Sequence, residues 1–211
     1  MADTPLELYN ELLSFSTSSE TTICQLHKPC NGHPLCAILS KTPVIDFDHI
    51  EKQLAKGHRP TSPSCDGVTL SSDHSVFCFF EIKGWDKFVS FNIVDAMNPS
   101  EAEKTRVKNQ AVSYNLKGKL LQSIDDCIII TMQNDLFPKI PYAYIVVTDI
   151  DSKKNGIEDI AANLTSLAET SSVWTYCDEI MKDLLNNVEI RIKKVYTHCR
   201  DFDSTLSLIS V

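Results

Sequence analysis

Three charged residues on two neighbouring segments have the types and spacing of a hydrolytic site. Asp66 follows a turn rich in proline and serine, and Glu81 and Lys83 end a mostly apolar run. Side chains alternate along a strand, so Glu81 and Lys83 are expected on the same face of an extended segment. A hairpin between the two segments would bring Asp66 beside Glu81. Two carboxylates placed together repel each other unless a cation or a proton lies between them.

This pair of carboxylates suits a hard divalent cation. Carboxylate oxygens are the ligands that Mg²⁺ favours, and Mn²⁺ accepts the same donors. A bound metal ion lowers the pKa of its water and neutralises charge that develops on a phosphate. Lys83 would orient or help deprotonate that water and add positive charge beside the phosphate. The pattern therefore indicates hydrolysis of phosphodiester bonds, with Asp66 and Glu81 as the metal ligands.

The elements that must position these residues follow from hydrophobic periodicity and from turn signals. The segments 76–83 and 142–148 are almost wholly apolar, which is typical of strands covered on both faces. Ser100 and Glu103 form the capping box of a long helix. Helices are predicted at 5–14, 46–56, 99–125, 157–168 and 176–185, and strands at 65–70, 76–83, 142–148 and 188–193. This order predicts the α/β class and a single domain over residues 1–211.

The motif residues resemble a known superfamily. Cys65-Asp66-Gly67 and Phe80-Glu81-Ile82-Lys83-Gly84 are similar to the core motif of the PD-(D/E)xK, or restriction-endonuclease-like, nucleases. The resemblance implies an α-β-β-β-α-β core over about 44–150, with a mixed central sheet flanked by helices. The segments 15–43 and 155–200 would then be N- and C-terminal additions. It also implies Mg²⁺- or Mn²⁺-dependent cleavage of nucleic acid, with DNA favoured.

Three further positions extend the resemblance. Gln110 and Tyr114 are similar to the Q-x3-Y element that follows the E-x-K strand in RecB-like members. Glu51 lies on the helix before Asp66, where many members carry an additional acidic metal ligand. Cys65 departs from the pattern, because it replaces the proline that gives the superfamily its name.

Simpler interpretations exist for each of these residues. Most E-x-K pairs on strands are surface ion pairs that contribute little energy. Gln110 and Tyr114 suit ordinary helix packing, and Glu51 suits the solvated face of an amphipathic helix. The alternative function is therefore a non-catalytic protein of nuclease fold that serves as a binding or assembly subunit, with a protein partner or as a homodimer.

The charge of the chain bears on the choice between these functions. A formal net charge of -8 argues against a broad electrostatic surface for nucleic acid. Local basic groups after the motif show where a nucleic acid could approach. They are Lys104, Arg106, Lys108, Lys117, Lys119, Arg191, Lys193 and Lys194.

A second candidate site lies in a loop-like segment near the N-terminus. Thiol and imidazole side chains recur there at every third position, at Cys24, His27, Cys30, His33 and Cys36. Such donors bind structural Zn²⁺, and a zinc-stabilised interaction module is a third functional possibility. Buried or incidental cysteines are the favoured interpretation, because the spacing is not a standard C-x2-C pair. The chain shows no signal-peptide pattern and no membrane-length apolar run, so a cytoplasmic protein with no membrane partner is expected.

Overall fold

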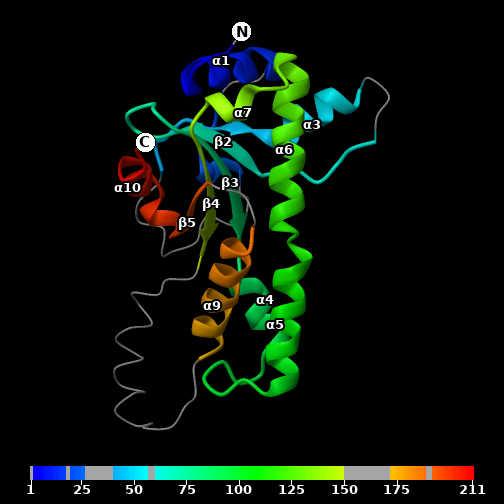
Figure 1. Ribbon diagram of the computed structural model, residues 1–211. Helices are drawn as coiled ribbons and strands as arrows, with labels where there is room; N and C mark the ends of the chain where they lie inside the picture. The colour runs from blue at the N-terminus through cyan, green and yellow to red at the C-terminus, as the bar shows by residue number, and fades with distance from the viewer. Residues whose placement is uncertain (1, 18–19, 27–39, 57–59, 150–171, 189–191) are drawn as a thin grey trace. The chain divides into compact units, whose positions relative to one another are not determined.

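The computed structural model describes residues 2–17, 20–26, 40–56, 60–149, 172–188 and 192–211 (Figure 1). These residues form two compact units. The first unit comprises Met1–Ile82, Lys117–Val147 and Ile190–Val211, and the second comprises Lys83–Leu116 and Thr148–Glu189. The first unit contains Asp66 and Glu81, and the second begins at Lys83.

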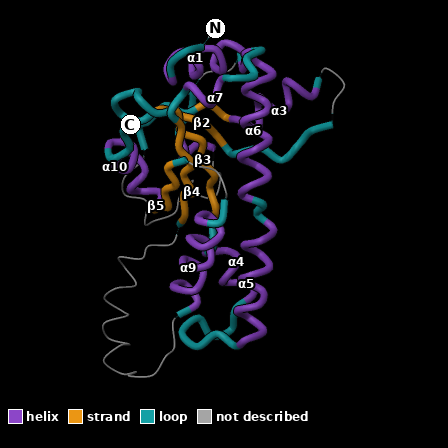
Figure 2. Tube along the Cα trace, in the orientation of Figure 1, coloured by secondary structure: helices purple, strands orange, loops and turns teal. Residues whose placement is uncertain are grey.

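A five-stranded mixed sheet, in the order β1-β2-β3-β4-β5, organises the fold (Figure 2). The strands are β1 (Ile45–Asp46), β2 (Gly67–Leu70), β3 (Phe77–Lys83), β4 (Tyr142–Thr148) and β5 (Lys193–His198). β1 pairs antiparallel with β2, and β2 pairs antiparallel with β3. The chain between β3 and β4 is helical, as a connection between neighbouring parallel strands requires. The predicted α/β class is therefore confirmed.

Helices of the first unit cover both faces of this sheet. They are α1 (Pro5–Ser16), α2 (Ile23–Leu26), α3 (Phe47–Ala55), α6 (Leu116–Thr131), α7 (Leu136–Lys139) and α10 (Phe202–Ser207), with a short 3₁₀ turn, η2 (Cys199–Asp201), before α10. Local chemistry explains where two of them begin. Thr4 and Glu7 form a capping box at the start of α1, and Asp46 caps α3 by accepting the His49 N–H.

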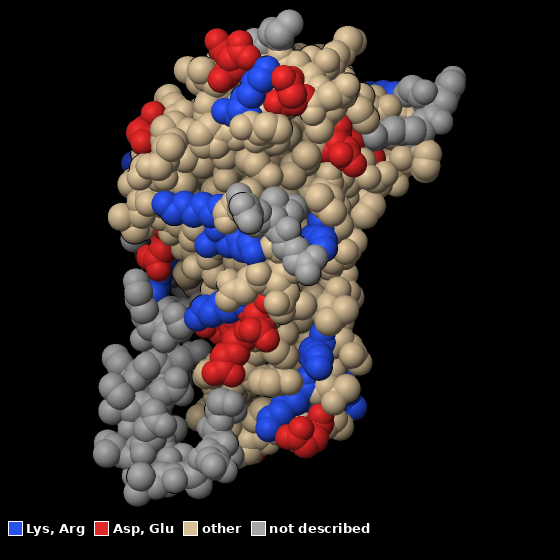
Figure 3. Space-filling view, viewed as in Figure 1, with Lys and Arg blue, Asp and Glu red and all other residues tan. Residues whose placement is uncertain are grey.

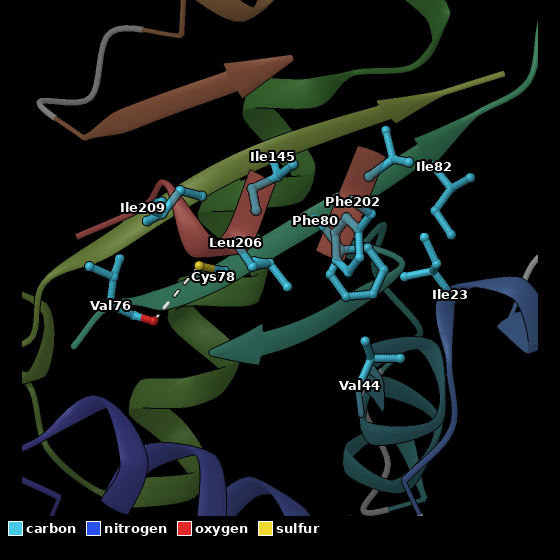
Figure 4. Close-up of a cluster of buried hydrophobic side chains, with 12 residues drawn as sticks. Ile23, Val44, Val76, Cys78, Phe80, Ile82, Ile145, Phe202, Leu206 and Ile209 are labelled. Carbon is cyan, nitrogen blue, oxygen red and sulfur yellow. Dashed lines mark hydrogen bonds between the residues drawn. The ribbon is translucent and has the colours of Figure 1, made fainter. Parts of the chain in front are cut away.

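One face of β3 is sealed by an apolar core (Figure 4). Cys78, Phe80 and Ile82 point into it, together with Phe202 and Leu206 of α10. The rings of Phe80 and Phe202 meet edge to face, with centroids 5.4 Å apart. The alternation predicted for the strand at 76–83 is therefore confirmed on this face.

The opposite face of β3 carries Phe79 and Glu81. The Phe79 ring packs against Phe47 of α3 at 6.2 Å between centroids, and against Phe137 of α7 at 5.7 Å. Two residues further along the strand, Glu81 contacts Lys119 of α6. Glu81 is thus a charged residue that follows two phenylalanines, Phe77 and Phe79, on this face of β3.

The described residues of the second unit form the helices α4 (Asp86–Asn92), α5 (Glu101–Ser113) and α9 (Val173–Asn186). α5 packs against α9, with Val107 and Ala111 buried on α5 and Cys177 buried on α9. Ser100 and Glu103 close the predicted capping box at the start of α5.

Several predicted boundaries need correction. The single helix predicted at 99–125 is two helices, because Asn115 adopts a left-handed conformation with φ 49° between α5 and α6. Of the strand predicted at 188–193, residues 189–191 lie outside the described residues, and β5 is present at Lys193–His198. The helix predicted at 157–168 falls outside the described residues. The strand at 142–148 is confirmed with the predicted bounds.

Candidate functional site

The register of the β2–β3 hairpin brings Asp66 and Glu81 together. Gly67 lies opposite Phe80 in this antiparallel pair, so the next position along the register sets Asp66 opposite Glu81. Asp66 immediately precedes β2. Its side chain still bonds to the neighbouring strand, because Oδ2 accepts a hydrogen bond from the Ile82 N–H at 2.6 Å. The predicted meeting of these two carboxylates is therefore a consequence of strand pairing.

Gly67 in the Cys-Asp-Gly sequence has a packing role. A Cβ added to Gly67 would lie 2.4 Å from Cζ of Phe80 and 2.9 Å from the Ile45 carbonyl oxygen. The Phe80 ring therefore covers the bare backbone of its cross-strand partner. Only glycine leaves room for that ring, which in turn holds the register that aligns Asp66 with Glu81.

A lysine from α6 is the cation between the two carboxylates. The Nζ atom of Lys119 donates to Oε1 of Glu81 and lies 3.8 Å from Oδ1 of Asp66. The Glu81 side chain is 0 % exposed, whereas the side chains of Lys119 and Asp66 are 21 % and 27 % exposed. The sequence indicated Lys119 only as one of several basic residues, because no local pattern links it to residues on the sheet.

The charges of Lys119, Glu81 and Asp66 shift the pKa values of neighbouring groups. Burial lowers the pKa of Lys119, but the negative charges of Glu81 and Asp66 raise it by more, so the net shift is upward. Lys119 is therefore an ammonium at neutral pH. Burial and the Glu81 charge also raise the pKa of the neighbouring Cys65 thiol well above its ordinary value. Cys65 is thus a neutral thiol beside the acidic pair and lacks the thiolate that a nucleophile would need.

The backbone N–H of Cys65 makes a hydrogen bond that a proline at this position could not make. The Cys65 N–H donates to Oγ of Ser123 on α6 at 2.9 Å, and both groups are buried. Proline has no N–H and could not make this bond. This hydrogen bond therefore links Cys65, the residue before Asp66, to α6, the helix that also carries Lys119.

The acidic residues of α3 differ in their relation to Asp66. The Glu51 carboxylate is buried, and its Oε1 accepts the Ser62 N–H at 2.6 Å, which ties α3 to the turn before Asp66. Asp48, one helical turn earlier, interacts electrostatically with Asp66. Burial and then the Asp66 charge raise the pKa of Asp48 above its ordinary value. Asp48 is thus an acid of α3 close enough to Asp66 for the Asp66 charge to raise its pKa.

Lys83, Gln110 and Tyr114 meet within the second unit. The Lys83 ammonium lies 5.1 Å from the centroid of the Tyr114 ring, a cation–π distance. Burial raises the pKa of Tyr114 to about 12, while a hydrogen bond with the Gln110 side chain acts in the opposite direction. The Tyr114 ring also packs against Trp85, with centroids 5.5 Å apart. Three residues predicted to serve the site are therefore assembled with one another.

The candidate zinc segment lies almost entirely outside the described residues. Of its five predicted ligands, only Cys24 lies within the described residues. Cys24 is a half-buried free thiol. Within the described ranges, no three His, Cys, Asp or Glu side chains gather as a metal-binding group. The zinc site stays a prediction.

The basic residues after the motif have varied surroundings. Lys104 pairs with Glu101 at 2.8 Å, and the Arg106 guanidinium donates to the Asn92 carbonyl oxygen at 3.1 Å. On the face drawn in Figure 3, basic and acidic side chains are interspersed among larger neutral areas. Arg191 lies outside the described residues.

No helix in the described part of the chain is long and apolar enough to cross a membrane.

The donor set of the first unit fits a cation. Two carboxylates from paired strands already converge on one positive charge, and Mg²⁺ binds proteins through one or two carboxylates while keeping several waters. The number of carboxylates at Asp66 and Glu81 is thus compatible with the ligands that such an ion takes from a protein. Searches against protein-family models, curated proteins and solved structures found no match to this chain.

Proposed function

We propose that this protein is a metal-dependent nuclease that hydrolyses phosphodiester bonds in nucleic acid, with DNA the favoured substrate. One observation carries the proposal: the carboxylates of Asp66, next to β2, and of Glu81, on β3, converge on the ammonium of Lys119. Burying a carboxylate on an apolar strand face is costly and calls for a cation nearby. A phosphodiesterase that uses Mg²⁺ or Mn²⁺ accounts for that arrangement.

Each residue has a role in this proposal. Asp66 and Glu81 hold the divalent cation, which when bound supplies an acidified water and neutralises charge on the phosphate. Asp48 adds negative charge next to Asp66 and favours a cation over an anion there. Lys83 adds positive charge for the phosphate from the end of β3. Gln110 and Tyr114 hold the Lys83 side chain in place through the cation–π contact.

The restriction-endonuclease-like core is the fold that we propose for this function. α3, the β2–β3 hairpin, the helices α5 and α6, and β4 follow one another as helix, hairpin, helices and strand, with one strand fewer between the helices than in the implied α-β-β-β-α-β core. The pairing of β1 with β2 adds a strand in front of α3. These features support the proposed core, together with the motif residues on β3.

The test is cleavage of labelled single- and double-stranded DNA and RNA with Mg²⁺ or Mn²⁺, with EDTA as the metal-free control. Variants Asp66→Asn, Glu81→Gln and Lys83→Met are purified in parallel with the wild-type protein. Glu101→Gln, which removes an exposed carboxylate of α5, is the matched control. We expect metal-dependent cleavage in the wild type and in Glu101→Gln, and a loss of roughly 100-fold or more in the three site variants. Cleavage that persists in Asp66→Asn and Lys83→Met would refute the assignment.

A second candidate function is nucleic-acid or protein binding without cleavage. The observation that favours it is the same Lys119 contact, because an internal ammonium already neutralises much of the carboxylate pair. In that case, the wild type would shift labelled nucleic acid in a gel but leave it intact at any metal concentration. Binding would then be unaffected by Asp66→Asn.

A further inference from the structure

Lys119 occupies the place that a metal ion would take at the carboxylate pair. Its Nζ atom donates to Glu81 and lies 3.8 Å from Asp66, so one ammonium reaches both proposed metal ligands. All three residues belong to the first unit, and they come from α6, β3 and the residue before β2. The cation position is thus filled by the protein's own side chain.

The charges of the two carboxylates favour an ammonium beside them. The Glu81 side chain is 0 % exposed, so water does not stabilise its charge. Two adjacent carboxylates without a counter-ion would repel, and one of them would be protonated. One lysine reduces the charge of the group from -2 to -1. A divalent ion would bring it to zero, and its positive charge would repel the Lys119 ammonium from the same two carboxylates.

The Lys119 side chain is flexible enough to move its ammonium away from the two carboxylates. A lysine carries its charge on a flexible four-carbon stem with several rotatable bonds. The side chain is 21 % exposed, so solvent reaches part of it in the folded protein. Rotation about its side-chain bonds would move the ammonium towards solvent without any movement of α6.

We propose that Lys119 is the resident counter-ion of the Asp66–Glu81 pair and competes with the divalent cation for it. This inference rests on the proposed function, because it assumes that the pair is a metal site. Lys119 then sets the metal affinity of the site and keeps the metal-free protein folded. Metal binding expels the ammonium from the carboxylates towards solvent.

The first experiment measures Mn²⁺ binding by calorimetry in the wild type, Lys119→Gln and Lys117→Gln. Lys117 is the matched control, because it is exposed at the start of the same helix. We expect Lys119→Gln to bind Mn²⁺ roughly tenfold more tightly or better, within the usual range of coupling between competing ligands. Lys117→Gln should bind like the wild type. Equal or weaker binding in Lys119→Gln would overturn the inference.

The same titrations separate this inference from the proposed function. Wild-type binding that Asp66→Asn abolishes and Lys119→Gln leaves unchanged refutes the competition but supports the metal site. Binding by Lys119→Gln alone supports the competition and argues against a metal-dependent activity of the wild type. Absence of binding in both proteins refutes the metal site and the competition together.

A second experiment needs no variant and covers the case in which Lys119→Gln fails to fold. The wild-type protein is reductively methylated with and without Mg²⁺, and the modification of each lysine is measured by mass spectrometry. Methylation of Lys119 should be slow without metal and several-fold faster with Mg²⁺, because the ammonium has left the carboxylates. The rate at Lys117 should not change. A Lys119 rate that is independent of Mg²⁺ would overturn the proposal.

Discussion

The Lys119 ammonium on α6 donates to the Glu81 carboxylate on β3, which joins two residues of opposite charge from different layers of the fold. Glu81 is fully buried, whereas Lys119 keeps part of its side chain in solvent. The two residues are therefore unequal partners, and removing one is not equivalent to removing the other.

The first prediction concerns this asymmetry. Lys119→Met should lower the free energy of unfolding by about 3 kcal/mol or more, because it leaves a buried carboxylate without its cation. Glu81→Gln should cost less, because the ammonium that remains can turn towards solvent. Urea denaturation in the presence of EDTA measures both. The double variant Glu81→Gln/Lys119→Met should recover part of the loss, and strictly additive effects would contradict a direct pairing.

The second prediction concerns the contact between Gly67 and Phe80. Gly67→Ala should destabilise the protein by about 1–3 kcal/mol, because the added methyl group overlaps the Phe80 ring and approaches the Ile45 carbonyl. Denaturation of Gly67→Ala, Phe80→Leu and the double variant measures the coupling. The smaller side chain at position 80 should make Gly67→Ala less costly. An equal cost in both backgrounds would show that the ring is not the cause.

The third prediction concerns the bond from the Cys65 N–H to Ser123. Ser123→Ala leaves a buried N–H without its acceptor and should cost about 1–3 kcal/mol in unfolding free energy. In a Cys65→Pro background that donor is absent, so Ser123→Ala should cost much less. Cys65→Ala keeps the N–H and serves as the control background. The full cost of Ser123→Ala in the proline background would contradict this explanation.

The fourth prediction concerns pH and the capping box of α5. The Val94 N–H, the Ser100 hydroxyl and the Ser100 N–H hydrogen-bond the Glu103 carboxylate and lower its pKa to about 2. A depressed pKa stabilises the folded state above the unfolded pKa, near its ordinary value of 4.5, and this contribution is lost as pH falls towards 2.

Thermal unfolding of the wild type and Glu103→Gln from acid to neutral pH checks this prediction. The difference in Tm should be largest above pH 4.5 and shrink as the pH falls to about 2. Glu101→Gln, at an exposed position of the same turn, is the matched control. A constant difference for Glu103→Gln over the whole range would show that its charge is not involved.

The sequence determined the local elements well, because their signals lie within a few residues of each other. The apolar runs at β3 and β4, the capping box at Ser100, and the α/β class are all set by short-range patterns. The meeting of Asp66 and Glu81 was also within reach, since a single short turn joins the two strands. In contrast, the break at Asn115 depends on one backbone angle in a segment whose periodicity continues across it.

The tertiary structure alone decided which cation meets the carboxylates. Lys83 was predicted to act on the water and the phosphate, and its ammonium lies over the Tyr114 ring. Lys119 lies 38 positions beyond Glu81, and Ser123 lies 58 beyond Cys65. Such contacts arise when α6 packs on the sheet, and no periodicity in the chain records which helical turn will lie over which strand. Local patterns specify the acids of this site, and helix packing specifies their counter-ion.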